Sequence, residues 1–313
     1  MNTLGACAEP FLFIIDAGMK RPEIHKLNDI PEGIKFSTPL TSNSSIEQIY
    51  SKSFSLKKVP ISFEKYYEAF SHVMEKIRHG NTYLLNLTFP TRIETELTLE
   101  DIFRISVAKY KLLYYNNFVV FSPEIFVRIK DGKISSFPMK GTIDASIPSA
   151  CEALLNDEKE IAEHNTIIDL IRNDLSIVSD NVTVARYRYV ERIKTFDKEL
   201  LQVSSEITGE LNQGYERRLG NIITGMLPAG SVTGAPKRET IKIIGECEQY
   251  DRGWYTGVFG IFDGEQLDSA VMIRFIESDK EGLIYKSGGG ITFLSDPAKE
   301  YEELIAKVYV PIG

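Results

Sequence analysis

Residues 125–137 read IFVRIKDGKISSF, two short runs of mostly apolar residues joined by Asp131-Gly132. An Asp-Gly pair between two such runs is the strongest short-range signal for a tight β-hairpin. A second hairpin is predicted where Asp263-Gly264 joins Val258–Phe262 to Leu267–Ile276. The sequence therefore predicts antiparallel strands, and not the parallel sheet of a doubly wound fold.

Helical periodicity appears between the predicted strands. From Ser62 to His79 apolar residues recur every three or four positions. Ser62 can cap the start of this helix and Gly80 can end it. The same reasoning predicts helices at Asp157–Ser179, Pro236–Glu248 and Pro297–Val308. Hairpins interleaved with helices indicate an α+β fold.

Length and charge restrict the class of protein. The 313 residues can form one large domain or two modest ones. The residues before 58 show no periodic pattern and predict irregular backbone, so we expect a short N-terminal segment (1–58) packed on the main domain (59–313). Thirty-six Lys and Arg against 44 Asp and Glu give a net charge of −8, which argues against nucleic acid and anionic membranes as partners.

The compartment can also be inferred from the sequence. No apolar run reaches the roughly 18 residues of a membrane helix, and residues 1–10 do not resemble a secretion signal. Cys7, Cys151 and Cys247 are odd in number and form no CxxC pattern. Such cysteines are typical of a reducing compartment, so we expect a cytoplasmic protein without a thiolate metal site.

Two pairs of glutamates have the same spacing. Glu160 and Glu163 stand three residues apart on one predicted helix, and Glu300 and Glu303 repeat that spacing on another. Residues three apart share a helix face, so each helix can direct two carboxylates to one point. Oxygen ligands of this kind suit Mg²⁺. Solvated surface charges are the alternative for each pair taken alone.

Glycines and two charged residues add further candidates. Gly225–Gly234 precedes a helix that opens at Pro236, and Gly288–Gly290 is a run of three. Such stretches either turn the chain or let backbone approach a ligand closely. Lys140 and Glu124 each follow a predicted strand. Each is either a surface charge or a group with an altered pKa.

Read together and in order, these segments resemble the chorismate-binding enzymes, which include anthranilate, aminodeoxychorismate, isochorismate and salicylate synthases. The resemblance covers roughly residues 60 to 310. The segments that carry it are Phe121–Glu124, Pro138–Thr142, Lys159–His164, Asp169–Asp174, Gly230–Lys237, Arg252–Gly257, Ser269–Arg274, Gly288–Ile291, Glu300–Glu303 and Lys307. The chain differs from the common family pattern at Leu84 and Gln202, where glutamine and histidine are frequent.

The resemblance implies a fold and a site. The fold is two orthogonally packed antiparallel sheets flanked by helices, in α/β/β/α layers. The four glutamates are expected to hold Mg²⁺, which receives the ring carboxylate of chorismate. Arg274 and Tyr255 are expected to hold its enolpyruvyl carboxylate. Further substrate contacts are expected from Gly141, Thr142, His164, Thr233, Gly288, Gly289, Gly290 and Lys307.

Lys140 points to one branch of the family. The resemblance implies lysine at this position in aminodeoxychorismate synthases and alanine in anthranilate synthases. In the lysine enzymes this amine attacks C2 of chorismate, Glu124 protonates the leaving C4 hydroxyl, and ammonia then takes C4. We expect the surroundings to lower the pKa of Lys140 enough for attack.

The implied product is 4-amino-4-deoxychorismate, the precursor of para-aminobenzoate and folate. No Gly-x-Cys-x-Gly motif of a glutaminase is present, so a separate glutamine amidotransferase is expected to supply ammonia. Component I of anthranilate synthase is the alternative enzyme. A non-catalytic regulator that binds chorismate is the alternative from another class.

Overall fold

The computed structural model describes residues 1–44, 54–194 and 199–312, and within them the strands form two antiparallel sheets. The first sheet has the order β10 (Met139–Asp144), β12 (Glu199–Glu210), β9 (Lys133–Ser136), β8 (Ile125–Lys130), β15 (Leu267–Val271), β14 (Val258–Phe262), β1 (Phe11–Ile15) and β2 (Glu23–Lys26), and β11 (Asp180–Lys194) pairs with β12. The second has the order β13 (Gly234–Ala235), β5 (Leu84–Glu94), β17 (Gly282–Thr292), β16 (Phe275–Asp279), β7 (Phe118–Ser122), β6 (Tyr110–Tyr114) and β3 (Ile34–Ser37), and β4 (Lys57–Val59) pairs with β5.

Helices lie outside the two sheets. Their bounds are α1 (Asn2–Ala6), α2 (Phe63–Arg78), α3 (Leu99–Ile105), α4 (Ala150–Asn156), α5 (Glu158–Ser176), α6 (Leu219–Gly225), α7 (Lys237–Cys247) and α8 (Pro297–Ala306), with 3₁₀ turns η1 (Leu27–Asp29), η2 (Tyr215–Arg218) and η3 (Gly230–Val232). The hydroxyl of Ser62 accepts the backbone N–H of Lys65 and caps α2, as predicted. Gly80, with φ of +75°, follows the last turn of α2.

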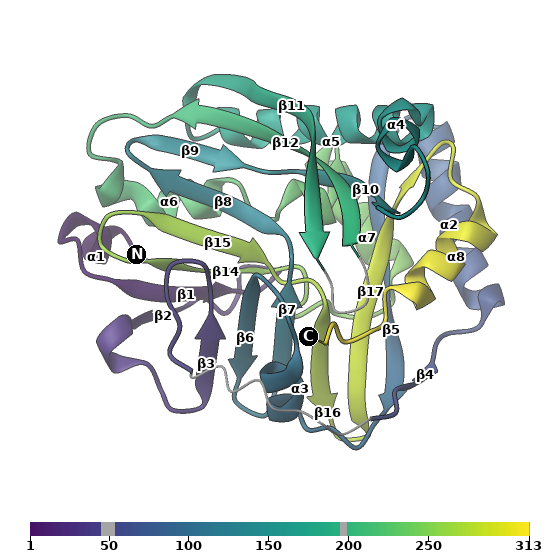
Figure 1. The fold of residues 1–313 in the computed structure, drawn as a ribbon, viewed down its shortest axis with the longest axis horizontal. Coiled ribbons are helices and arrows are strands. Elements are labelled where there is room, and N and C mark those ends of the chain that lie inside the picture. Colours follow the sequence, from purple (N-terminus) through teal and green to yellow (C-terminus); the bar gives the residue numbers. More distant parts are fainter. Residues whose placement is uncertain (45–53, 195–198, 313) are drawn as a thin grey trace.

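The layered arrangement of sheets and helices follows from what packs against each face of the strands. Along β1, Leu12 and Ile14 pack between the sheets, while Phe11, Phe13 and Ile15 pack against α5 and α6. Both faces of this strand are therefore core. Helices α2, α7 and α8 cover the outer face of β5 and β17. Strands such as β8 and β15 run across the view of Figure 1 while β5 and β17 run nearly upright, so the two sheets cross. The predicted α+β fold with two antiparallel sheets is confirmed.

Two expectations about the backbone are wrong. The stretch 267–276 is not one strand, because β15 ends at Val271 in the first sheet and β16 begins at Phe275 in the second. Arg274, with φ of +52°, lies in the break. The residues before 58 are not irregular in their described part, because β1, β2 and β3 add strands to both sheets.

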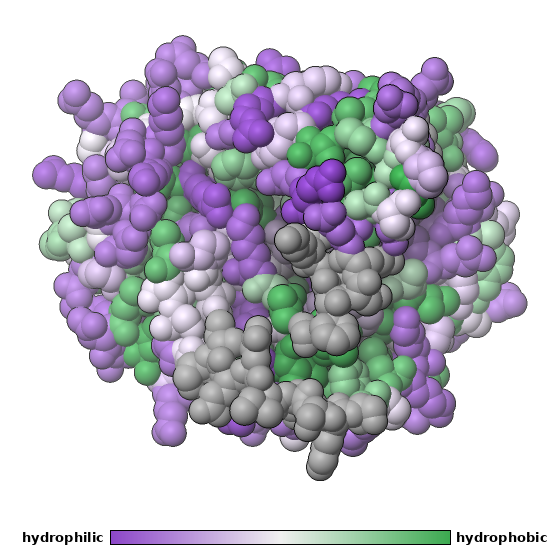
Figure 2. Space-filling view, viewed as in Figure 1, coloured by the Kyte–Doolittle hydropathy of each residue, from purple (hydrophilic) through white to green (hydrophobic). Residues whose placement is uncertain are grey.

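The face of the molecule in Figure 2 is mostly polar. On the face shown in Figure 2, hydrophilic residues predominate and hydrophobic residues form scattered patches. Across the described residues, no helix is long and apolar enough to cross a membrane.

Candidate active site

A cavity of about 530 Å³ opens where the two sheets meet. Its walls come from β8, β9 and β10 of the first sheet, from β5 and β17 of the second, and from α5, η3 and α8. The acidic and basic residues that line it are Glu124, Lys140, Glu160, Glu163, Asp174, Arg274, Lys286, Glu303 and Lys307. The cavity therefore combines several cations with several carboxylates.

Glu124 and Arg274 stand where the chain passes from one sheet to the other. Glu124 lies between β7 and β8, and Arg274 lies between β15 and β16. The two crossings run side by side, because the Val271 N–H donates to the Glu124 carbonyl and the Phe121 N–H donates to the Arg274 carbonyl. Glu124 and Arg274 stand 150 positions apart in sequence, and both side chains line the cavity.

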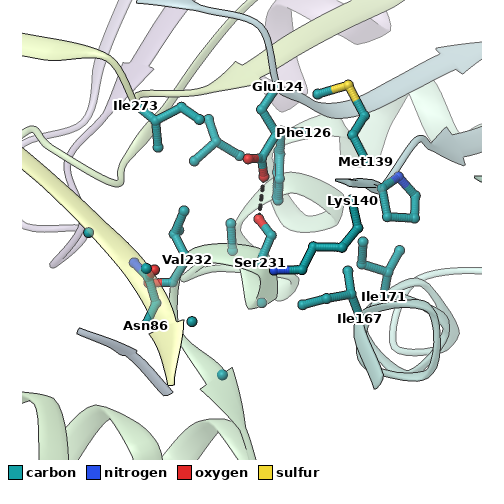
Figure 3. A pocket seen from close by; sticks show the side chains of 18 of the residues that line it. Asn86, Glu124, Phe126, Met139, Lys140, Ile167, Ile171, Ser231, Val232 and Ile273 are labelled. Atoms are coloured by element: carbon teal, nitrogen blue, oxygen red, sulfur yellow. Dashed lines mark hydrogen bonds between the residues drawn. The ribbon is translucent and has the colours of Figure 1, made fainter. Parts of the chain in front are cut away.

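Burial controls the proton affinity of Glu124. It raises the pKa of this carboxyl, and a hydrogen bond from Ser231 together with the charges of Arg274 and Lys307 opposes the rise only in part. The hydroxyl of Ser231 donates to Glu124 Oε1 (Figure 3). A carboxyl with a raised pKa is suited to donate a proton.

Lys140 enters the cavity from β10. The ladder between β10 and β12 shifts register at Lys140, next to Gly141 with φ of +74°, a conformation that favours glycine. The Lys140 Nζ lies 2.5 Å from Glu163 Oε2. Burial acts to lower the pKa of Lys140, but Glu163, Glu160 and Glu303 outweigh it and the pKa is raised. The expectation of a lowered pKa is therefore wrong for this arrangement.

Helices α5 and α8 bring their glutamates to the same region. A Cβ added at Gly141 would lie 3.3 Å from Glu160 Oε2, and one added at Gly289 would lie 3.5 Å from Glu300 Oε2. Neighbouring glycines thus leave room beside both carboxylates. Glu303 Oε1 lies 2.7 Å from Lys307 Nζ.

The glutamates suit Mg²⁺ by their chemistry, since carboxylate oxygens are its preferred protein ligands. In the described part of the chain, however, no three acidic, His or Cys side chains are grouped closely enough to hold a metal ion. Instead the ammonium of Lys140 forms an ion pair with Glu163 and interacts through charge with Glu160 and Glu303. The donor set fits the ion, and the magnesium assignment stays a proposal.

Most predicted substrate residues line the cavity. They are Gly141, Tyr255, Arg274, Gly288, Gly289, Gly290 and Lys307. Arg274 also lies over the ring of Tyr309, 5.1 Å from its centre. Lys307 donates to the Gly288 carbonyl at 2.8 Å, which ties the end of α8 to the glycine run of β17.

Two predicted substrate residues, His164 and Thr233, are absent from the cavity lining. His164 is buried behind the wall, with Nε2 2.7 Å from Ser205 Oγ. Burial and the charges of Arg188 and Lys140 lower the pKa of His164 to about 4. Thr233 is buried and donates to the Ala229 carbonyl at 2.8 Å. The side chain of Thr142 lies outside the described part of the structure.

Sequence reasoning assigned no role to several residues that line the cavity. They are Asn86, Asp174, Ser231 and Lys286, together with Leu84 and Gln202, at which the chain differs from the common pattern. Ser231 and Asp174 stand inside the quoted segments Gly230–Lys237 and Asp169–Asp174. Their place in these segments was the signal in the sequence that could have marked them as site residues. It did not show that Ser231 contacts Glu124.

Known proteins resemble this chain over its full length. A protein of Pasteurella multocida named an uncharacterized PabA-like protein is 49% identical, covering 100% of this chain and 97% of its own length. A protein of Haemophilus influenzae with a similar name is 47% identical, covering 99% and 95%. Component 1 of anthranilate synthase from Leptospira biflexa is 29% identical, covering 95% of this chain and 64% of that protein.

Solved structures resemble the fold. Anthranilate synthase component I from Streptococcus pneumoniae has a TM-score of 0.65 at 26% identity, covering 83% of this chain and 60% of that one. The menaquinone-specific isochorismate synthase of Escherichia coli has a TM-score of 0.68 at 18% identity, covering 84% and 64%. The family profile described as chorismate binding enzyme matches residues 21–313. With a cavity of this composition between two crossed sheets, the chain belongs to the chorismate-binding enzymes.

Proposed function

We propose that this chain is component I of aminodeoxychorismate synthase, which converts chorismate and ammonia to 4-amino-4-deoxychorismate for para-aminobenzoate and folate synthesis. One observation carries the proposal: the Lys140 side chain enters the same cavity as the Glu124 carboxyl (Figure 3). A nucleophile and an acid in one cavity suit a substitution in which one ring carbon is attacked while a hydroxyl leaves another.

The proposed reaction has two substitutions. After its ion pair with Glu163 opens and it loses one proton to solvent, Lys140 Nζ bonds to C2 of chorismate. Both ring double bonds shift, the C4–O bond breaks, and Glu124 gives its proton to the leaving hydroxyl, which departs as water. Ammonia then bonds to C4, both double bonds shift back, and the C2–Nζ bond breaks with its electron pair returning to Lys140 Nζ. Ammonia loses one proton, which restores the acid form of Glu124.

The remaining residues bind and orient the substrate. Arg274 suits the enolpyruvyl carboxylate because a guanidinium pairs with a carboxylate through two hydrogen bonds. Glu160, Glu163, Glu300 and Glu303 would hold Mg²⁺, which would supply positive charge to the ring carboxylate. The three glycines of β17 let the substrate approach the backbone.

A product assay tests the proposal. The purified chain with chorismate, Mg²⁺ and ammonium salt should form 4-amino-4-deoxychorismate, resolved from other products by chromatography. Lys140→Ala should lower that rate by about 10³-fold or more, because it removes the attacking group. Lys140→Arg should also fail, since a guanidinium stays protonated. Lys133→Ala, which removes an exposed lysine from β9 of the same sheet, is the matched control.

Mass spectrometry tests the covalent step. Chorismate without ammonia should leave an adduct on Lys140. A Lys140→Ala enzyme that makes 4-amino-4-deoxychorismate at the wild-type rate would exclude the covalent mechanism.

Anthranilate synthase is the second candidate, because several relatives at 29 to 38% identity are named component 1 of that enzyme. Anthranilate as the product of the wild-type chain would establish that reaction instead. Lys140 argues against anthranilate synthase, because the resemblance implies alanine at this position in those enzymes.

A further inference from the structure

Some groups around the Glu124 carboxyl act on it through charge at a distance, and one forms a direct hydrogen bond with it. Arg274, Lys307 and Tyr255 interact with it through charge, and Lys140 enters the same cavity. Among the described residues, Ser231 is the side chain that donates a hydrogen bond to this carboxyl, at Oε1 (Figure 3). Charges at a distance set the proton affinity of a carboxyl, but a hydrogen bond also fixes its rotation.

Ser231 stands on a turn that is fixed at both ends. It is the middle residue of η3. Gly230, the first residue of η3, packs closely on Asp174, because a Cβ added at Gly230 would lie 2.8 Å from Asp174 Oδ2. Asp174 Oδ1 in turn lies 2.7 Å from Lys237 Nζ. At the other end, Arg252 Nη1 donates to the Val232 carbonyl at 2.7 Å.

These contacts bind the turn to α5, to α7 and to the segment before β14. Asp174 and Val232 are buried, and Arg252 is held by Glu248 through an ion pair of 2.6 Å. A hydroxyl carried by such a turn has little freedom to move, so its partner oxygen is held in one place.

We propose that Ser231 is a positioning residue for the proton donor: by holding Oε1 of Glu124, it leaves Oε2 to carry the proton and directs that oxygen toward the leaving hydroxyl of the substrate. The role rests on the proposed function, in which Glu124 is the acid. Ser231 acts through Glu124 and takes no part in bond making itself.

The first experiment observes Glu124 without substrate. The infrared C=O band of its protonated carboxyl is assigned by its loss in Glu124→Gln and then followed against pH. Ser231 donates to the carboxylate and so favours the ionised form. Ser231→Ala should therefore move the titration midpoint upward by about one pH unit, the size expected for one hydrogen bond to a charged group.

The second experiment measures turnover against pH at a constant concentration of free ammonia, because ammonia also titrates. Ser231→Ala should lower kcat about 10- to 100-fold, as expected for a misplaced catalytic group, with little change in KM for chorismate. The alkaline limb of the kcat profile should move to higher pH, because Glu124 would keep its proton longer. Ser231→Thr retains the hydroxyl and should recover most of kcat.

Two comparisons separate positioning from a structural role. Ser269→Ala removes another buried hydroxyl, which donates to the Val127 carbonyl at 2.7 Å, and should leave the alkaline limb in place. In a Glu124→Gln background, Ser231→Ala should lower kcat far less than in the wild type, because the two residues act as one unit.

Either of two results would overturn the role of Ser231. The first is a titration midpoint of Glu124 that is the same in Ser231→Ala as in the wild type. The second is a kcat of the double variant reduced by the product of the two single-variant factors. The infrared result does not depend on which product forms. If the wild-type chain made anthranilate, the function proposal would fail while the contact between Ser231 and Glu124 would still be tested.

Discussion

At the scale of single residues, Lys140 and Glu124 are both buried, and burial alone would favour the neutral form of each side chain. For Lys140 the charges of three carboxylates outweigh burial and favour the charged amine. For Glu124 the nearby cations do not outweigh burial, so the protonated carboxyl is favoured. The sequence could not predict this difference. Glu163 and Glu303 belong to separate helices, and only the folded chain brings them to Lys140.

The raised pKa of Glu124 predicts a stability effect. The folded state binds this proton more tightly than the unfolded chain, whose carboxyl has a pKa near 4.5. Folding stability from this group is therefore lost as pH rises from 4.5 through the folded pKa. Glu124→Gln cannot ionise, so at pH 7 it should unfold a few degrees above the wild type while its turnover collapses.

Thermal unfolding measured across pH checks this prediction. The advantage of Glu124→Gln should shrink toward zero below pH 4.5. Glu265→Gln, which neutralises an exposed carboxylate in the turn between β14 and β15, should show no such pH-dependent gain. A Glu124→Gln protein less stable than the wild type at pH 7 would contradict the assignment.

At the scale of elements, local signals predicted both Asp-Gly hairpins and the helices α2, α5, α7 and α8. They did not predict the helices α1, α3, α4 and α6 or the break within residues 267–276. Asp131-Gly132 and Asp263-Gly264 fix their turns through backbone conformations that these residues tolerate. No comparable signal marks the passage from β15 to β16, because apolar residues continue through Met272 and Ile273. The passage depends on contacts with the neighbouring crossing at Glu124, which are distant in sequence.

Helices α5 and α8 lead to one prediction together, because Glu160, Glu163 and Glu303 line the cavity and Glu300 lies beside Gly289 in its wall. Glu163→Gln or Glu303→Gln should lower turnover at least about 100-fold with the fold intact, since an amide binds a hard cation more weakly than a carboxylate does. Initial rates against Mg²⁺ concentration provide the measurement. Glu302→Gln, on the exposed surface of α8, is the control. Undiminished turnover in excess chelator would remove the metal assignment.

At the scale of the whole molecule, the two crossed sheets and their outer helices were predictable once the ordered segments resembled a known family. The contribution of residues 1–58 was not. The apolar run at 11–15 has no alternation because both of its faces are core, and its partner β14 lies about 250 residues away. Local patterns contain no information on such a pairing.

The three cysteines of the chain lead to a prediction about a partner protein. Cys7 and Cys151 are exposed and Cys247 is buried, and none has the sequence setting of a glutaminase nucleophile. Ammonium salt should therefore support turnover by the purified chain, whereas glutamine should do so only after a separate amidotransferase is added. Product formation from glutamine by the purified chain alone would contradict this expectation.

The pairing of β1 with β14 affects how the protein folds during synthesis. Residues 258–262, the partners of residues 11–15, are made about 250 residues later in translation. At roughly 5–20 residues per second, that interval is on the order of ten seconds or more. Until then a strand of five apolar residues can pair with β2 alone. During that interval the nascent chain therefore exposes one edge of an apolar strand, which can pair with other chains until residues 258–262 have been made.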